Sequence, residues 1–285
     1  MSTEIIPENL LDDFDTRGFV ILPNFFTADI VAAAQAAIET LVDECATKLV
    51  AAGKANATHA DAAFETRWYQ LHEHCLTEAA DYLRAELHLE GLFGVFFHPR
   101  LLDIVETVLG NEIRLYPNYT VRPKLPNHEP TAVLWHQDGG YTEHWHKANN
   151  GDVADIRMLN VWSPLVPARV ENGCMEFIPG SHKLPLLPHE EREFYLEIPP
   201  KHIEPLAKDA VAIELDPGDV VLFHNMLCHR GLSNQAKTIR WSMDWRYQDA
   251  RQPTLRKENG HLAKSLLHPN DVVQSASEWA SLTFG

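Results

Sequence analysis

Histidine, aspartate and tryptophan are concentrated in one short stretch near the middle of the chain. The fourteen residues from 134 to 147, LWHQDGGYTEHWHK, hold three histidines, one aspartate and two tryptophans. His136 and Asp138 are one residue apart, so the end of a strand would direct both side chains to one face and toward a single ion. An imidazole and a carboxylate suit a divalent transition metal, but two ligands hold one weakly. The HxD pair therefore predicts a metal site only if a third ligand lies elsewhere.

A third ligand and a cation follow in the stretch from 216 to 246, DPGDVVLFHNMLCHRGLSNQAKTIRWSMDWR. A tight turn leads into an apolar run that ends at His229, and Arg240 lies eleven residues further on, in the next expected strand. We expect adjacent antiparallel strands to bring these two side chains into one pocket. Two histidines and one carboxylate leave three coordination positions open, an arrangement used for oxygen chemistry at ferrous iron. An arginine beside the metal can bind a carboxylate of a co-substrate through two parallel hydrogen bonds.

The elements that must position these residues change in character near residue 110. Before it the sequence is mainly helical: an apolar run at 19–22 predicts one strand, and helices are predicted at 27–52, 62–75 and 99–109. After it, short runs bounded by Pro, Gly, Asn or Asp predict strands at 112–123, 156–165, 174–178, 210–215, 219–224 and 238–247. Many short strands with turn signals predict an antiparallel sandwich or barrel.

The simplest domain organisation is a single domain over residues 1–285. It would consist of a helical part over about 1–110, a β core over about 111–250 and a C-terminal extension over 251–285. In the extension we expect a final helix with the apolar residues Val272, Val273, Ala276, Trp279 and Leu282.

The composition limits the kinds of partner that the chain is expected to bind. It has 24 Lys and Arg against 40 Asp and Glu, a formal charge of −16, and such a surface repels nucleic acid. The acidic first residues lack the charged and apolar regions of a secretory signal, and no run approaches the roughly 18 apolar residues of a membrane span. We therefore expect no membrane partner and a cytoplasmic location. The four cysteines lack CxxC spacing, which predicts neither disulfides nor a thiolate zinc site.

Four motifs agree in order and spacing with one enzyme family. They are WHQDGGY at 135–141, NVWSPL at 160–165, ENGCMEFIPGSH at 171–182 and GDVVLFHNMLCHRGLSN at 218–234. Together with Arg240, these motifs make the chain resemble the phytanoyl-CoA dioxygenase family of iron(II)- and 2-oxoglutarate-dependent oxygenases. The resemblance covers about 112 to 247, with a further likeness at FVILPNFF. It implies an all-β core with helices, a double-stranded β-helix (jelly roll, cupin-like) flanked by N-terminal helices.

The same resemblance implies roles for individual residues. His136, Asp138 and His229 would be the catalytic metal ligands, holding Fe(II). Arg240 would pair with the distal carboxylate of 2-oxoglutarate, and Trp162 would line that pocket.

At three further positions the resemblance implies more than one role. Arg122 falls where relatives have Lys-Pro, and it is either structural or in contact with the co-substrate. Asn118, four residues earlier on the expected strand, would face the same way and could also reach the co-substrate. Relatives often have His-Gly-Ser at the distal histidine, whereas residues 229–231 are His-Arg-Gly. The contact made by that serine is therefore in doubt, and Arg230 could instead point toward a substrate.

The implied reaction consumes 2-oxoglutarate and O2 and releases succinate and CO2. Because Asp138 retains the carboxylate that related halogenases lack, hydroxylation of a C–H bond in a small metabolite is favoured. Desaturation, ring closure or epimerisation can use the same ligands. A mixed aromatic and polar substrate pocket could be formed by Tyr141, His144, Trp145, Arg246 and Arg251. The 139–155 segment either covers the active site or lies only on the surface.

Two other classes of protein remain open. A cupin-like barrel could bind zinc or manganese and act as a hydrolase, although Arg240 and Trp162 would then have no evident purpose. A catalytically silent binding protein is the second alternative, and the intact triad argues against it. Metal analysis and succinate formation would separate the three. The sequence predicts neither the particular substrate nor the oligomeric state.

Overall fold

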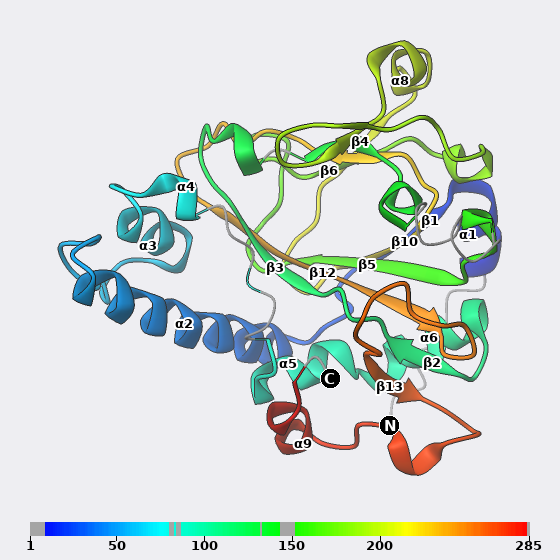
Figure 1. Cartoon of the computed structure of the whole chain (residues 1–285), viewed down its shortest axis with the longest axis horizontal. Coiled ribbons are helices and arrows are strands. Elements are labelled where there is room, and N and C mark those ends of the chain that lie inside the picture. The colour runs from blue at the N-terminus through cyan, green and yellow to red at the C-terminus, as the bar shows by residue number, and fades with distance from the viewer. Residues whose placement is uncertain (1–8, 80–82, 84–86, 132, 143–151, 284–285) are drawn as a thin grey trace.

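A computed structural model describes residues 9–79, 83, 87–131, 133–142 and 152–283. Two β-sheets lie face to face, and the longer helices cover the outer face of the larger sheet (Figure 1). This is the all-β core with flanking helices that the sequence predicts. No helix within these described ranges is long and apolar enough to cross a membrane.

The helices lie mostly before the β core, as the sequence predicts. The α-helices are α1 (Leu10–Arg17), α2 (Ala28–Ala51), α3 (Phe64–Leu71), α4 (Leu76–Ala79), α5 (Glu90–Phe96), α6 (Pro99–Leu109), α8 (Pro200–Ala207) and α9 (Ala276–Ser281). Five 3-10 helices are described: η1 (Glu129–Thr131), η2 (Asp138–Thr142), η3 (Val153–Asp155), η4 (Ser181–Lys183) and η5 (Pro269–Asp271). Helix α6 begins with Pro99. Proline is tolerated there because the first N–H groups of a helix have no partner within the helix. The helix is followed by Gly110, whose φ of +85° favours glycine.

Strands from distant parts of the sequence alternate between the two sheets. The large sheet has the order β1 (Phe19–Leu22), β10 (Val220–His224), β5 (Met158–Pro164), β12 (Arg240–Asp249), β2 (Ile113–Leu115), β13 (His261–Lys264), with β3 (Thr120–Lys124) also pairing β12. The small sheet has the order β4 (Val133–His136), β11 (His229–Gly231), β6 (Met175–Phe177), β9 (Val211–Ile213). A separate short pair is β7 (Glu190–Glu191) with β8 (Leu196–Glu197). All the strand pairings are antiparallel.

Strand β12 shows how the sequence builds two different faces. Its odd-numbered residues Trp241, Met243, Trp245 and Tyr247 are buried in the core that also contains residues of α2, α5, α6 and α9. Burying each large apolar side chain contributes about 1.5–3 kcal/mol. The even-numbered residues, Arg240 to Arg246, are polar and point the other way because side chains alternate along a strand. They therefore face the small sheet, where a second apolar cluster includes Trp162 and Phe177.

The C-terminal extension differs from its prediction. Helix α9 covers only Ala276–Ser281, and Ser275 accepts a hydrogen bond from the Glu278 backbone as its N-terminal cap. Val272 and Val273 lie before this helix. Val272 forms a β-bridge to Leu262 of strand β13, which the sequence did not predict. Backbone pairing with the sheet therefore replaces the first turn of the expected helix.

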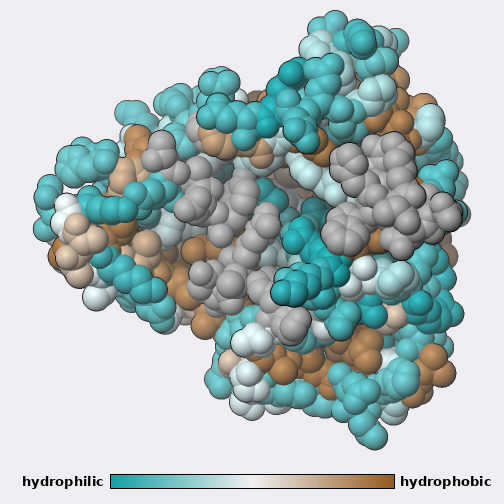
Figure 2. Space-filling model, in the orientation of Figure 1, coloured by the Kyte–Doolittle hydropathy of each residue, from teal (hydrophilic) through white to brown (hydrophobic). Residues whose placement is uncertain are grey.

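Hydrophilic residues cover much of the face seen in Figure 2, and hydrophobic residues form smaller patches between them.

Candidate active site

The ends of two small-sheet strands bring the predicted triad together. Strands β4 and β11 are neighbours, and His136 lies directly opposite His229 in their register. The HxD spacing predicted His136 and Asp138 on one strand, and this was wrong. Strand β4 ends at His136, and Asp138 is the first residue of η2. The carboxylate reaches the histidines through this tight turn. All three residues are buried, between 3% and 7% exposed.

The three side chains present their ligand atoms to one point. Asp138 Oδ1 lies 3.2 Å from His136 Nε2 and 3.9 Å from His229 Nε2. The three ligand atoms all lie within 4.8 Å of one another. Within the described ranges, His136, Asp138 and His229 are the histidine, cysteine and acidic residues whose geometry could hold a metal ion.

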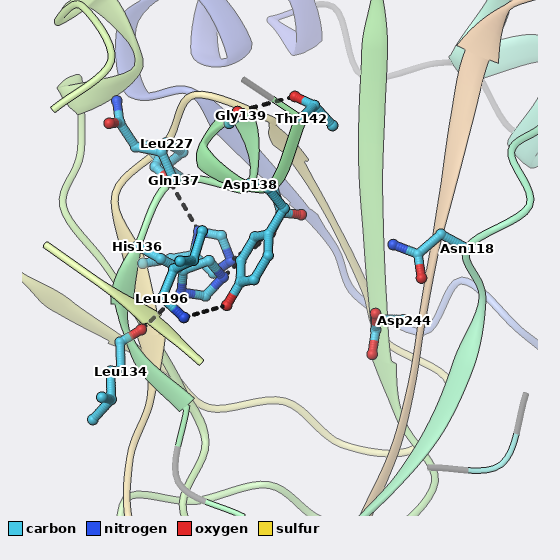
Figure 3. Close-up of polar contacts among 12 residues, drawn as sticks. Asn118, Leu134, His136, Gln137, Asp138, Gly139, Thr142, Leu196, Leu227 and Asp244 are labelled. Carbon is cyan, nitrogen blue, oxygen red and sulfur yellow. Dashed lines mark hydrogen bonds and ion pairs between the residues drawn. The ribbon is translucent and has the colours of Figure 1, made fainter. Parts of the chain in front are cut away.

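Backbone carbonyls orient both imidazole rings. His136 Nδ1 lies 2.7 Å from Leu134 O and His229 Nδ1 lies 2.8 Å from Leu227 O (Figure 3). A carbonyl only accepts, so each Nδ1 carries the proton and each Nε2 keeps a lone pair for a metal. Burial, and then the neighbouring His136, lower the pKa of His229 to about 3, so this ring is neutral near pH 7.

Arg246 binds the other oxygen of the triad carboxylate. Its Nη2 and Nε donate to Asp138 Oδ2 at 2.6 and 3.2 Å. Burial alone would raise the pKa of Asp138, but the Arg246 guanidinium and the adjacent His136 hold it well below its usual range. Asp138 is therefore an anion with Oδ2 taken by Arg246 and Oδ1 directed at the histidines.

The inner face of the large sheet is strongly cationic. Arg122 forms an ion pair with Asp244, whose Oδ2 also accepts from Thr120 Oγ1 at 2.6 Å. Burial raises the pKa of Asp244, whereas Arg122 and then Arg246 lower it, with a net shift below its ordinary value. Arg240 is 3% exposed, donates to Ser242 Oγ, and has its guanidinium carbon 5.4 Å from the centre of the Trp162 ring.

A cavity of about 440 Å³ opens onto two residues of the triad, His136 and Asp138. His136, Asp138 and Tyr141 line one wall, and Asn118, Arg122 and Arg246 line another. In Figure 3, Asn118 and Asp244 lie across from His136 and Asp138. The Tyr141 hydroxyl accepts from the Leu196 backbone N–H at 3.1 Å, which ties η2 to β8. Arg240 and Trp162 do not line this cavity and lie buried between the sheets.

Two expectations about the site were wrong, and a third was confirmed. His229 and Arg240 are not on adjacent strands, because β11 belongs to the small sheet and β12 to the large one. Asn118 lies before β3 begins at Thr120, yet it lines the same cavity as Arg122, so the prediction that these two side chains face the same way is confirmed. Arg230 was expected to point toward a substrate. It follows His229 on β11, so its side chain points to the opposite, outer face of the small sheet. There its Nε lies 2.6 Å from Glu176 Oε2.

Three residues of the site were not predicted from the sequence, and two predicted residues lie outside the described ranges. Lys124 and Asp244 are buried on the inner face; spacing by two from Arg122 and from Arg246 was the signal that could have found them. Buried Gln137 donates to Met226 O at 3.0 Å and accepts from the Leu187 N–H, and no sequence pattern indicated it. His144, Trp145 and most of the possible lid at 139–155 lie outside the described residues.

The arrangement of opposed antiparallel sheets is shared with solved structures of other proteins. The structure resembles EctD from S. alaskensis, solved with 2-oxoglutarate and 5-hydroxyectoine (TM-score 0.61, 23% identity, 89% of this chain and 80% of that one). It also resembles the non-heme monooxygenase ThoJ (TM-score 0.59, 23% identity, 90% and 84%). These likenesses establish the double-stranded β-helix fold of such enzymes.

The family follows from the sequence itself. The phytanoyl-CoA dioxygenase (PhyH) family model matches residues 14–242, and the chain belongs to this family. It is 30% identical over 167 residues to 1-deoxypentalenic acid 11-beta-hydroxylase of Streptomyces arenae, covering 54% of this chain and 55% of that protein. It is 26% identical over 166 residues to the peroxisomal phytanoyl-CoA dioxygenase of Bos taurus, covering 56% and 47%. The matches therefore span about half the length of these curated relatives.

Proposed function

We propose that the protein is an iron(II)- and 2-oxoglutarate-dependent oxygenase that hydroxylates a C–H bond of a small metabolite. The observation that carries this proposal is the convergence of two imidazole Nε2 atoms and one carboxylate oxygen beneath an open cavity. Family membership and the fold support the same reaction class.

The residues fit a ferrous ion. Two neutral nitrogen donors and one carboxylate oxygen are the donor set of a facial site with three open positions. The hydrogen bonds from each Nδ1 to a carbonyl, and from Arg246 to Asp138 Oδ2, fix one lone pair from each residue toward the same point. When bound, iron would couple the oxidative decarboxylation of 2-oxoglutarate to substrate oxidation, releasing succinate and CO2.

The large sheet supplies the contacts for the co-substrate. In our proposal Arg240 binds the distal carboxylate of 2-oxoglutarate, because a guanidinium can form two parallel hydrogen bonds to a carboxylate. The face of Trp162 packs against this guanidinium and helps to exclude water from the contact. Arg122 forms an ion pair with Asp244 at the cavity wall, so a structural role suits it better than a direct contact with the co-substrate.

The cavity favours a substrate that carries an anionic group and an apolar body. Arg256 and Lys257 line it together with a single acid from the same segment, Glu258, while Met158 and Leu255 provide apolar contact. The relative from Streptomyces arenae is named as the hydroxylase of an acid, which agrees with this substrate class. Tyr141 and Arg246, predicted as substrate contacts, both line the cavity, and Arg246 would act mainly through Asp138.

Anaerobic spectroscopy tests the proposal directly. The protein loaded with ferrous iron and 2-oxoglutarate should develop a visible metal-to-ligand charge-transfer band, and the zinc-loaded protein should show none. Absence of the band with fully loaded iron would favour the hydrolase alternative. Screening carboxylic acids for substrate-dependent succinate release then identifies the substrate class, and a band without any such release would favour a silent binding protein.

A further inference from the structure

Lys124 is a buried lysine in a position that the metal triad does not explain. It is the last residue of β3 and pairs directly with Arg240, the first residue of β12. Both side chains are only 3% exposed. Directly opposite residues in an antiparallel pair have Cβ atoms about 4.5–5.5 Å apart, so two cations start from neighbouring points on the sheet.

Two glycines leave room for the lysine side chain between the sheets. A Cβ atom at Gly231 would lie 2.9 Å from Lys124 Nζ, and one at Gly173 would lie 2.6 Å from Lys124 Cδ. Gly173 also has a φ of +84°, which favours glycine by itself, but Gly231 has no positive φ. At Gly231 the missing side chain therefore serves the approach of the ammonium group, two residues from His229.

Burial of this ammonium beside a guanidinium is electrostatically unfavourable. Burial, then Arg240 and Arg122, lower the pKa of Lys124 well below its ordinary value. Lys124 Nζ donates to Leu232 O, but an ammonium has three protons to donate. Among the described residues, no aspartate or glutamate forms an ion pair with Lys124. An anionic ligand at this point would relieve the repulsion.

We propose that Lys124 and Arg240 together bind the distal carboxylate of 2-oxoglutarate, an inference that rests on the proposed function. The carboxylate would lie between an ammonium from β3 and a guanidinium from β12, both on the inner face of the large sheet. Lys124 then acts as a specificity residue, because it favours a dicarboxylate over a 2-oxo acid with an uncharged tail.

Binding of two co-substrate analogues to the iron-loaded protein tests this role. The ligands are 2-oxoglutarate and 2-oxopentanoate, which keeps the chelating end and replaces the distal carboxylate with a methyl group. Their dissociation constants are measured anaerobically from the charge-transfer band. Lys124→Met, which keeps a stem of similar length, should weaken 2-oxoglutarate binding by about tenfold or more, the size of a charge-assisted hydrogen bond. Binding of 2-oxopentanoate should change by less than about twofold.

Thermal unfolding without ligand separates this role from a structural one. Because the pKa of Lys124 is lower in the folded protein than its ordinary 10.5, burying it costs free energy below that pH. Lys124→Met should therefore not lower the Tm of the ligand-free protein, while the Tm increase caused by 2-oxoglutarate should shrink. Lys124→Gln, which can still donate to Leu232 O, gives a second neutral variant if the Met variant does not fold.

The exposed residue Lys237 supplies the matched control. Lys237→Met removes the same charge elsewhere and should leave both dissociation constants unchanged. Unaltered preference for 2-oxoglutarate in the Lys124 variants would overturn this inference while leaving the proposed function intact. Absence of a charge-transfer band in the wild-type protein would instead reject the proposed function.

Discussion

The two sheets provide chemically opposite walls to the same interior. The small sheet and the turn after β4 contribute lone pairs and a negative charge, from His136, Asp138 and His229. The large sheet contributes positive charge along β3 and β12, from Arg122, Lys124, Arg240 and Arg246. A metal cation suits the first wall and a dicarboxylate the second, so the two binding tasks should be separable by mutation.

The largest expected effect is on the small-sheet wall. His136→Ala, Asp138→Ala and His229→Ala should each abolish iron-dependent turnover, because each removes one of three ligands. Iron affinity should fall by more than the roughly 10–100-fold that loss of a ligand-orienting residue costs. Chelator competition measures the affinity, and circular dichroism should show a retained fold, since the three side chains surround a cavity.

His268 offers a control for this series because its side chain is 64% exposed. His268→Ala should leave iron affinity unchanged. Full activity in any triad variant would show that the substituted residue is not a ligand. Asp138→Gly is a finer probe, because it should retain part of the iron binding and lose hydroxylation.

The second-largest effect is expected on the large sheet, where substitution of Arg240 should weaken the binding of 2-oxoglutarate. Arg240→Ala should raise the dissociation constant for 2-oxoglutarate by at least about thirtyfold, since truncating one partner of a buried charge pair costs roughly 2–5 kcal/mol. Iron affinity should stay nearly constant. Arg240→Lys should recover only part of the loss, because an ammonium lacks the planar fork of a guanidinium. Titration of the charge-transfer band measures both variants, and wild-type affinity in Arg240→Ala would remove Arg240 from the co-substrate site.

The contrast between the walls also explains which features could be predicted from the sequence. Alternation and turn signals identified most strands, including β5, β10 and β12, because these patterns are local. The HxD pair and His229 were found through motif spacing, and the structure brings them together. The fold of the family was implied by the same motifs.

Strand neighbours could not be read from the sequence in this way. The consecutive strands β10, β11 and β12 lie in the large, small and large sheets in turn. Hydrophobic alternation indicates which face of a strand is buried but not which sheet the strand joins. His229 and Arg240 were therefore predicted on adjacent strands of one sheet. In the structure His229 lies on the small sheet and Arg240 on the large sheet opposite it. The contact between Arg246 and Asp138 joins residues 108 positions apart and depends on the same arrangement.

Arg246 is the residue that joins the two walls, and its substitution should have the smallest effect on the co-substrate. It lies on the inner face of β12 six residues after Arg240, yet it donates to Asp138 Oδ2 at 2.6 Å. By occupying Oδ2 it leaves Oδ1 as the single carboxylate atom for the metal. Arg246→Gln should therefore lower iron affinity by about tenfold, as is typical for residues that orient a ligand.

At saturating iron, the same variant should change the dissociation constant for 2-oxoglutarate by less than about threefold, well below the loss in Arg240→Ala. Loss of the Arg246 positive charge beside the metal opposes the loss of carboxylate orientation, which is why the effect on iron is moderate. Chelator competition and charge-transfer titration on one preparation give both values. A large loss of 2-oxoglutarate affinity with unchanged iron affinity would show that Arg246 serves the co-substrate, and that the division of tasks between the two sheets is wrong at this residue.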